Sequence, residues 1–285
     1  MVWKTIKLHY ICTLMLKLVV KRVFILVLIV AVSASCTDFR KLQKSSDWKA
    51  KYDGAMRFYE EGDYFRAIAL FEEVLPVTRG KDEGEKAQFY YAYAHYNDRQ
   101  FILSAHYFKT FYETYSRSEF ANEAQFMYAY SLYQNSPIYT LDQTSTEESI
   151  DAFQIFINRN VDSKFVTEAS QILRELQVKL ETKAYHSAKL YHKIGVLNSA
   201  IIAFDNFAIN YPDSRFNSEL QYLKLEAAYM MADQSIPSKQ KGRYKDVINM
   251  YEEYIDDFPE SIYIAQAQKF YDDALNQLEK LEKLL

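Results

Sequence analysis

The chain has 285 residues, of which 49% are apolar and 25% charged, and a formal net charge of −4. This composition predicts a folded protein and excludes a disordered one. It contains only 6 Gly and 5 Pro, which favours helices over a many-turned β fold, and no glycines form the GxxxxGK[ST] or GxGxxG phosphate-binding motifs.

The first 35 residues have the pattern of a secretory signal peptide. Five basic residues and no acidic residue lie in this segment, and an apolar run covers Val23 to Val32. The small residues Ser33, Ala34 and Ser35 follow, as at a cleavage site, and the apolar run is short for a membrane span. We therefore expect residues 1–35 to be removed. Met15 is an alternative start, and an uncleaved anchor is the less favoured alternative.

Cys36 directly follows these small residues, in an arrangement that resembles the lipobox of bacterial lipoproteins. Ser33 departs from that motif, which usually has a Leu-like residue there. The resemblance implies that Cys36 is acylated, with chains such as palmitate, and becomes the new N-terminus. The other interpretation is a plain signal peptide followed by a chance Cys.

Removal of the leader would also change the cysteine content and the charge of the chain. Cys12 lies in the leader, so the mature chain would have no intrachain disulfide and no Cys-ligated metal site. It would retain 29 basic and 38 acidic residues, a net charge of −9, which disfavours nucleic acid as a partner and also attraction of the whole chain to an anionic membrane face. Apart from the covalent lipid on Cys36, we expect no cofactor.

One apolar helical pattern recurs five times in the rest of the sequence. Ala67, Ile68, Phe71, Val74 and Leu75 lie at offsets 0, 1, 4, 7 and 8, which form one face of an α-helix. The same offsets recur in four further copies. Their residues at offsets 0 and 4 are Ser104/Phe108, Ser149/Phe153, Ala200/Phe204 and Val247/Tyr251. Five copies with an aromatic residue at offset 4 indicate an internal repeat.

A second helix is expected before each of these, with a small residue between two aromatic ones. The segments AQFYYAYAHY (87–96) and AQFMYAYSLY (124–133) agree at seven of ten positions. A small residue at a helix crossing lets two backbones approach closely. The five copies have at this position Ala55, Ala92, Ala129, Ala188 and Leu225.

A serine follows four of the five copies at a fixed distance, with an aromatic residue two positions later. The pairs are Ser118/Phe120, Ser163/Phe165, Ser214/Phe216 and Ser261/Tyr263. We expect each serine to be the N-cap of the next helix. In the first copy Lys81 holds the serine position, in a looser connection.

The copies are 37, 45, 51 and 47 residues apart, so the repeat length varies. We place the additional residues in a loop at 135–146, in a loop at 232–242, and in a long helix over Val166–Ile194, a stretch without Gly or Pro.

The helix pairs resemble the tetratricopeptide repeat, whose unit has about 34 residues in two helices. Ala55, Gly62, Tyr64, Ala67 and Phe71 match its small, turn and aromatic positions. We therefore predict an all-α fold, a superhelical array of about five tetratricopeptide-like helix pairs with a C-terminal capping helix. The expected organisation is a lipid-anchored linker at 36–46 and a repeat domain at 47–285, with pairs near 47–80, 82–117, 119–161, 163–212 and 214–259 and a cap at 261–285.

The lipobox, the five divergent pairs and the turns YPDS (211–214) and FPES (258–261) together resemble the BamD family of the outer-membrane β-barrel assembly machinery. The most specific segments are YEEGDYFRAIALFEEVLP (59–76), AYHSAKLYHKIG (184–195) and NYPDSRF (210–216). The resemblance implies a non-catalytic scaffold on the periplasmic face of the outer membrane. It also implies three kinds of partner: a BamA-like barrel insertase, other assembly subunits, and the C-terminal signal of unfolded outer-membrane proteins.

Stacked helix pairs form a concave groove that the first helix of each pair lines. By the repeat register, Met56, Tyr59, Tyr93 and Tyr96 face this groove in the first two pairs. Tyrosines can hold an extended, aromatic peptide by stacking and by hydrogen bonds to its backbone. The alternative is that these tyrosines only pack between helices.

The sequence lacks the residue spacings that are typical of catalytic and metal-binding sites. The histidines outside the leader lack the i, i+4 spacing of a helical metal site: His95, His106, His186 and His192. Glu148-Ser149 matches the catalytic dipeptide of some lysozyme-like enzymes, but it opens a repeat helix and no glycine-rich domain follows. We therefore expect no enzymatic activity and no metal site.

Two other functions remain open for a lipoprotein of this kind. One is an envelope adaptor for peptidoglycan synthesis or cell division, and the other is a glycan-binding lipoprotein of a nutrient-uptake system. The expected partners, murein synthases or a glycan transporter, distinguish both from a barrel-assembly scaffold.

Overall fold

The computed structural model describes residues 38–283, so the expected leader and Cys36 lie outside the described residues. The described part is helical and contains no strand. After a helical segment at 38–44, the helices are α2 (Trp48–Glu60), α3 (Tyr64–Thr78), α4 (Asp82–Asn97), α5 (Phe101–Thr114), α6 (Ala121–Asn135), α7 (Thr144–Arg159), α8 (Val166–Lys193), α9 (Leu197–Asn210), α10 (Asn217–Asp233), α11 (Pro237–Asp257) and α12 (Ile264–Lys283).

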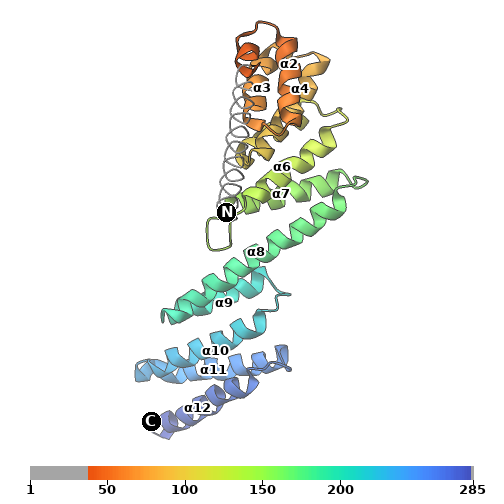
Figure 1. Ribbon diagram of the computed structural model, residues 1–285. Coiled ribbons are helices and arrows are strands. Elements are labelled where there is room, and N and C mark those ends of the chain that lie inside the picture. The colour runs from red at the N-terminus through yellow and green to blue at the C-terminus, as the bar shows by residue number, and fades with distance from the viewer. Residues whose placement is uncertain (1–37, 284–285) are drawn as a thin grey trace, which may run out of the picture. The chain divides into compact units, whose positions relative to one another are not determined.

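The described chain divides into two compact units. The N-terminal unit comprises residues 38–136 and 148–170, and the C-terminal unit comprises residues 137–147 and 171–283. Within each unit, consecutive helices pack as antiparallel neighbours (Figure 1). The prediction of an all-α array of tetratricopeptide-like helix pairs is thereby confirmed for each unit.

The second helix of every pair provides the core. Its aromatic residue at offset 4 is almost completely buried in all five pairs, at Phe71, Phe108, Phe153, Phe204 and Tyr251. The small residue of the first helix is buried as well, at Ala55, Ala92, Ala129, Ala188 and Leu225. These positions let the two helices of a pair approach each other and bury an aromatic ring between them, which is the main stabilising contribution of each pair.

The three insertions of the sequence have different structures. The long helix predicted over Val166–Ile194 is confirmed as α8, and the insertion of the third pair leaves residues 136–143 between α6 and α7. The prediction of a loop at 232–242 is wrong in part. Pro237 is the first residue of α11, where its fixed φ suits a helix start, so the additional residues lengthen this helix.

A turn with a repeated hydrogen bond precedes the first helix of the later pairs. The hydroxyl oxygens of Ser118, Ser163, Ser214 and Ser261 each accept from the backbone N–H two residues later, at 3.0, 3.3, 3.1 and 3.2 Å. The N-caps of α6 and α10 are nevertheless Phe120 and Phe216. The prediction that the serines are N-caps is therefore wrong, because each serine closes a turn ahead of the helix.

The same serines connect successive pairs. Each hydroxyl is hydrogen-bonded to a residue near the start of, or midway along, the preceding first helix: Ser118 to Glu85, Ser163 to Asn122, Ser214 to Glu181 and Ser261 to Ser218. The aromatic residue two positions later stacks on a ring of that helix, with centroids 4.6, 4.6, 4.1 and 4.8 Å apart: Phe120 on Phe89, Phe165 on Phe126, Phe216 on Tyr185 and Tyr263 on Tyr222. We call this combination of serine and stacked rings the joint.

The connection between the first and second pairs has different residues at the positions of the joint. Lys81 replaces the serine, and its Nζ lies 4.0 Å from the centroid of the Trp48 ring. Trp48 stands seven residues before Ala55, as Glu85 stands seven before Ala92. A cation–π contact, worth about 0.5–1 kcal/mol, thus takes the place of the serine hydrogen bond.

Candidate functional site

Three of the predicted groove residues come together on the first helices of the N-terminal unit. Tyr59 lies on α2, and Tyr93 and Tyr96 lie on α4; all three side chains are half-buried. The phenol groups of Tyr59 and Tyr96 are close enough to Tyr93 to contribute to the raised pKa of its hydroxyl, although burial is the largest cause. Met56 is also half-buried, but its described packing is against the core of the first pair.

Tyr59 lies where α2, α3 and α4 meet. Its ring centroid is 5.7 Å from that of Tyr64 and 5.1 Å from that of Tyr90, both in edge-on geometry. Its hydroxyl accepts a hydrogen bond from Asn97 Nδ2 at 3.4 Å. Burial raises the pKa of Tyr59 to about 12, so this phenol stays neutral and able to donate a hydrogen bond at neutral pH.

Tyr93 links the first helices of the second and third pairs. Its hydroxyl donates to Glu123 Oε1 at 2.5 Å, and its ring packs edge-on against Phe89 and Phe108 at 5.0 and 4.9 Å. Burial, followed by the Glu123 carboxylate, raises the pKa of the phenol. A hydrogen bond to a charged acceptor holds Tyr93 in one orientation and makes it part of the wall between two pairs.

Tyr96 extends the row towards α6. Its ring lies 5.6 Å from Phe101 and 6.0 Å from Tyr130, and burial raises its pKa to about 12. Tyr130 is in turn 5.7 Å from Tyr133. These two residues of α6 were missed in the sequence, although they stand 37 positions after Tyr93 and Tyr96 in the matching ten-residue segments. Tyr59, Tyr93, Tyr96, Tyr130 and Tyr133 are called the phenol row below.

The equivalent positions of the C-terminal unit carry different chemistry. One and four residues after the small residue stand Lys189 and His192 on α8, and Glu226 and Tyr229 on α10. Lys189 Nζ donates to Glu219 Oε1 at 2.6 Å, and His192 Nε2 lies 3.1 Å from Glu226 Oε2. The polar side chains of this face therefore contact one another.

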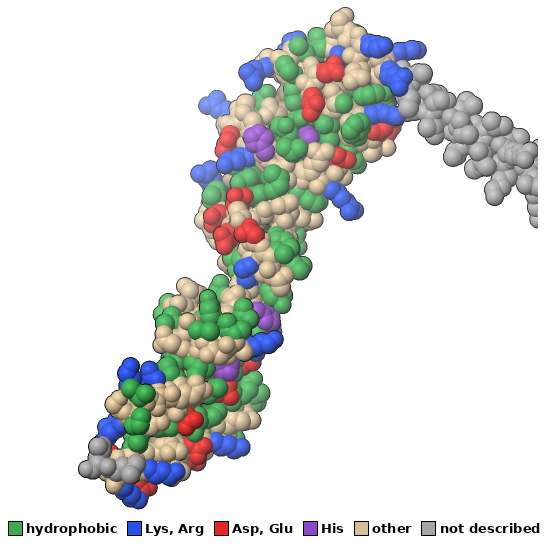
Figure 2. Space-filling view, turned by 90° about the vertical axis from the view of Figure 1, so that its left-hand side faces the viewer, with side chains coloured by type: hydrophobic (Ala, Val, Ile, Leu, Met, Phe, Trp, Pro, Cys, Tyr) green, Lys and Arg blue, Asp and Glu red, His purple; other side chains and the backbone are tan. Residues whose placement is uncertain are grey.

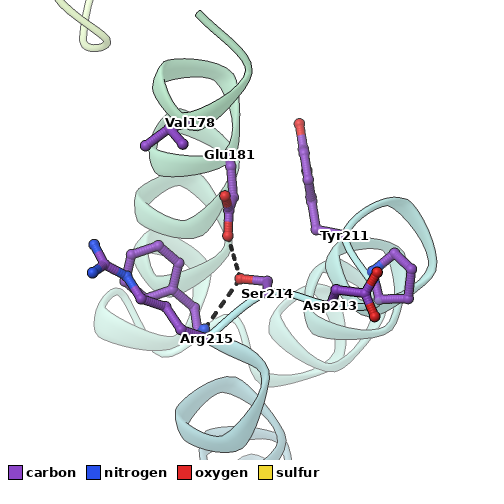
Figure 3. A pocket seen from close by; sticks show the side chains of 8 residues that line it. Val178, Glu181, Tyr211, Asp213, Ser214 and Arg215 are labelled. Atoms are coloured by element: carbon purple, nitrogen blue, oxygen red, sulfur yellow. Dashed lines mark hydrogen bonds between the residues drawn. The ribbon is translucent and has the colours of Figure 1, made fainter. Parts of the chain in front are cut away.

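The C-terminal unit also contains a surface pocket of about 550 Å³, between α8 and the turn that leads to α10. Figure 3 shows Glu181 on α8 directed at Ser214, with Tyr211 and Asp213 on the turn. The bond between Glu181 and Ser214 and the one from the Phe216 N–H to Ser214 belong to the joint. The pocket is thus a recess beside a repeated structural element, and its serine is already engaged.

The other candidate residues from the sequence, such as His95 and Ser149, are bonded to neighbouring residues of the fold. His95 is buried, with Nδ1 2.9 Å from Gln100 Oε1, and Ser149 donates to the Ala129 carbonyl at 3.0 Å. Between residues 38 and 283, no three His, Cys, Asp or Glu side chains gather as a metal-binding group. Over the same range, no helix has both the length and the apolar character of a membrane span.

Comparison with known proteins gives a family and one relative. The family model described as YfiO, outer membrane lipoprotein, matches residues 44–214. A provisionally named outer membrane protein assembly factor BamD of Aquifex aeolicus (strain VF5) is 23% identical over 254 residues, which cover 87% of this chain and 82% of that protein.

Among solved structures, two crystal structures of kinesin light chain TPR-like repeats from Podosopora anserina match this chain at 11% and 9% identity. They cover 72% and 73% of this chain and 94% and 98% of their own, and both have a TM-score of 0.32. Similarity at this level adds nothing to the description of the helix pairs given above.

Proposed function

Because the chain belongs to the YfiO family of outer membrane lipoproteins, we propose that it is a non-catalytic scaffold of the machinery that assembles β-barrel proteins in the outer membrane. In this role it binds the barrel insertase and other assembly subunits. It also receives the C-terminal signal of unfolded outer-membrane proteins. The name of the Aquifex aeolicus relative supports this proposal.

The proposed anchor is a covalent lipid on Cys36, added after removal of residues 1–35. A diacylglycerol thioether together with an N-acyl chain exceeds the two signals that stable membrane anchoring needs. The repeat domain then lies on the periplasmic face of the outer membrane. The small residues before Cys36 and the family match support this arrangement.

The phenol row is the observation that carries the proposed binding of unfolded chains. Its side chains are half-buried, so each presents part of a ring at the surface of the first helices, and Tyr59 and Tyr96 keep neutral hydroxyls. Rings can stack on the aromatic side chains of an extended peptide, and hydroxyls can bond to its backbone. The contacts with Glu123 and Asn97 hold these rings in place, which lowers the entropic cost of binding.

Affinity purification of the full-length protein from detergent-solubilised envelope tests the assembly role. The expected result is recovery of a β-barrel insertase with the native protein, and its reduced recovery with Cys36→Ala, which cannot be lipidated. Recovery of murein synthases or of a glycan transporter without an insertase would contradict the proposal. That outcome would indicate one of the two alternative functions for a lipoprotein of this kind.

Substitution of Tyr96 tests the phenol row separately. We expect Tyr96→Ala to weaken binding of an extended peptide with a C-terminal aromatic residue by about tenfold, since one ring contact is worth about 1–1.5 kcal/mol. Tyr229→Ala is the matched control, because Tyr229 holds the same repeat position in the fifth pair and is also half-buried. Equal effects of the two substitutions would exclude the phenol row as the peptide site.

A further inference from the structure

The first described residues, 38–44, are helical and are fixed to the N-terminal unit on one side. The Phe39 ring lies 5.9 Å from the Phe58 ring in edge-on geometry, and the Arg66 guanidinium lies 5.8 Å from it. Leu42 packs against the core of the first pair. Asp38 forms an ion pair with Arg57 of α2. These contacts determine which side of the helix faces solvent.

Gly54 on α2 provides the space for this helix. A Cβ atom at position 54 would lie 2.6 Å from Leu42 Cδ1, well inside the contact distance of two carbon atoms. The absence of a side chain at Gly54 therefore lets Leu42 reach the core. Helix 38–44 is thus seated in a defined orientation and is part of the folded unit.

The outward side of helix 38–44 is basic. Arg40, Lys41 and Lys44 are exposed, and within residues 38–283 none of them forms an ion pair. The two nearest acidic residues in the sequence are engaged, Asp38 with Arg57 and Asp47 with the N–H groups of Lys49 and Ala50. We call Arg40, Lys41 and Lys44 the basic face.

The basic face stands in a chain whose charge is otherwise negative. Without residues 1–35 the net charge would be −9, yet three cations without a described ion pair lie here within five residues. Residues 239–243 also contain three cations, but Lys241 pairs with Glu282 and Arg243 bonds to Ser235. Figure 2 shows Lys and Arg side chains gathered at the upper end of the N-terminal unit. Such a local excess of positive charge suits an anionic partner that meets this end of the unit.

We propose that the basic face binds the headgroups of anionic phospholipids beside the lipid anchor. The proposal rests on the proposed lipidation of Cys36, which is two residues before Asp38. Two residues span at most about 7 Å, and the helix rises about 1.5 Å per residue from Asp38, so the Cα atoms of Arg40 and Lys41 lie within about 12 Å of that of Cys36. This distance is comparable with the Debye length of about 8 Å at physiological salt. The anchor therefore brings the basic face within electrostatic range of the membrane surface.

The expected contribution of the three cations is large for so short a segment. One Lys or Arg close to an anionic surface strengthens binding by about fivefold, so three correspond to roughly a hundredfold. The contact would hold the N-terminal unit against the membrane surface, because helix 38–44 is itself fixed to that unit. The lipid alone would leave the unit free to turn about its tether.

Trp48 provides a spectroscopic probe for this contact. The chain has two tryptophans, Trp3 in the leader and Trp48 at the start of α2, so Trp3→Phe leaves Trp48 alone whatever the processing. Its Cα lies at most about 14 Å from that of Lys44, since the two are four positions apart in the sequence. The full-length protein would be reconstituted into vesicles of brominated phosphatidylcholine with and without phosphatidylglycerol that is brominated to the same extent, and Trp48 fluorescence quenching measured.

We expect phosphatidylglycerol to increase the quenching, and high salt to abolish the increase. The triple variant Arg40→Gln, Lys41→Gln, Lys44→Gln should lose this increase. The control Lys193→Gln, Lys245→Gln, Lys269→Gln should retain it, because these exposed lysines of the C-terminal unit lie elsewhere in the chain and form no described ion pair. Equal quenching of the native chain and the first triple variant would overturn the proposal.

Mass spectrometry of the N-terminal peptide separates a failure of the anchor from a failure of the basic face. If Cys36 carries no lipid, the anchor proposal fails, and binding of the full chain to added phosphatidylglycerol vesicles tests the basic face alone. Binding weakened roughly a hundredfold in the Arg40, Lys41, Lys44 variant supports it. Unchanged binding contradicts it.

Discussion

The N-terminal and C-terminal units share their internal connections but differ in the residues that the first helices present. Both contain the joint, with a serine hydrogen bond and stacked rings, as at Ser163/Phe165 and at Ser214/Phe216. At the positions that follow the small residue, however, the N-terminal unit has the phenol row. The C-terminal unit has Lys189, His192, Glu226 and Tyr229 there.

This difference shows that the repeat separates residues that hold the array together from residues that are free to vary. The joint and the buried aromatic residues use positions that all pairs share. The face of the first helices is then open to different chemistry in each unit. Neutral phenols suit an aromatic, extended peptide, whereas paired charges such as Lys189 and Glu219 require a partner that competes for an ion pair.

A joint of the N-terminal unit and a joint of the C-terminal unit should contribute equally to the free energy of unfolding. Phe165→Ala and Phe216→Ala each remove a stacked, half-buried ring, so we expect each to lower the free energy of unfolding by about 3 kcal/mol. Urea unfolding, followed by circular dichroism, measures both. A difference of more than about 1.5 kcal/mol between the two variants would mean that the joints are not equivalent.

Hydrogen bonds across the first helices should differ between the units. Tyr93→Phe leaves the Glu123 carboxylate without its partner, so we expect a loss of about 2 kcal/mol. Lys189→Met should cost about 0.5 kcal/mol, because its pair with Glu219 is partly exposed and screened by salt. Measuring the free energy of unfolding of both variants at low and high salt distinguishes the two kinds of contact. A strong salt dependence of the Tyr93→Phe effect would argue against this assignment.

The phenol row should make stability sensitive to alkaline pH. Tyr59 and Tyr96 have pKa values of about 12 in the folded chain, against 10 for an ordinary tyrosine. The folded state therefore holds these protons more tightly, and its stabilisation is complete below pH 10 and lost as the pH rises towards 12.

The double variant Tyr59→Phe, Tyr96→Phe tests this pH dependence. It should show a flatter decline of the unfolding free energy over the same alkaline range, because it lacks two of the titrating groups. An unchanged decline would place the responsible groups elsewhere in the chain.

The smallest expected effects concern the turn inside the pairs. Gly62 and Gly195 have φ values of 80° and 77°, and Arg99 holds the same position of the second pair with φ 60°. Arg99→Gly should stabilise the protein by about 0.5 kcal/mol, since relief of the left-handed strain exceeds the added chain entropy. Gly195→Ala should destabilise it by about 1 kcal/mol. Thermal unfolding of both variants shows whether each substitution stabilises or destabilises the protein. Destabilisation by Arg99→Gly would contradict the prediction that Arg99 is strained.

Much of the fold could be predicted because burial repeats along the sequence. Phe71, Phe108 and Phe153 recur at one offset of an apolar face, and helical periodicity predicts their burial directly. Residues of the phenol row could be predicted by the same register. Tyr130 and Tyr133 follow from it too, once the identity of residues 87–96 and 124–133 is extended to the face as well as the core.

Other features depend on side-chain geometry that periodicity does not contain. A serine two residues before a helix and a serine at its N-cap have the same local sequence, and only the backbone path of Phe120 and Phe216 distinguishes them. The contact of Lys81 with Trp48 replaces a hydrogen bond by a different kind of interaction. The partner of Tyr93, Glu123, stands 30 residues away on another helix.

The joint has a consequence for how such a chain can change its length. Every joint uses residues from two successive pairs alone, such as Glu85 and Phe89 with Ser118 and Phe120. A gene duplication that copies one pair together with its turn would therefore create a new joint of the same kind at each end, without a new contact elsewhere. Residues 87–96 and 124–133, which agree at seven of ten positions, lie in the first helices of two such neighbouring pairs.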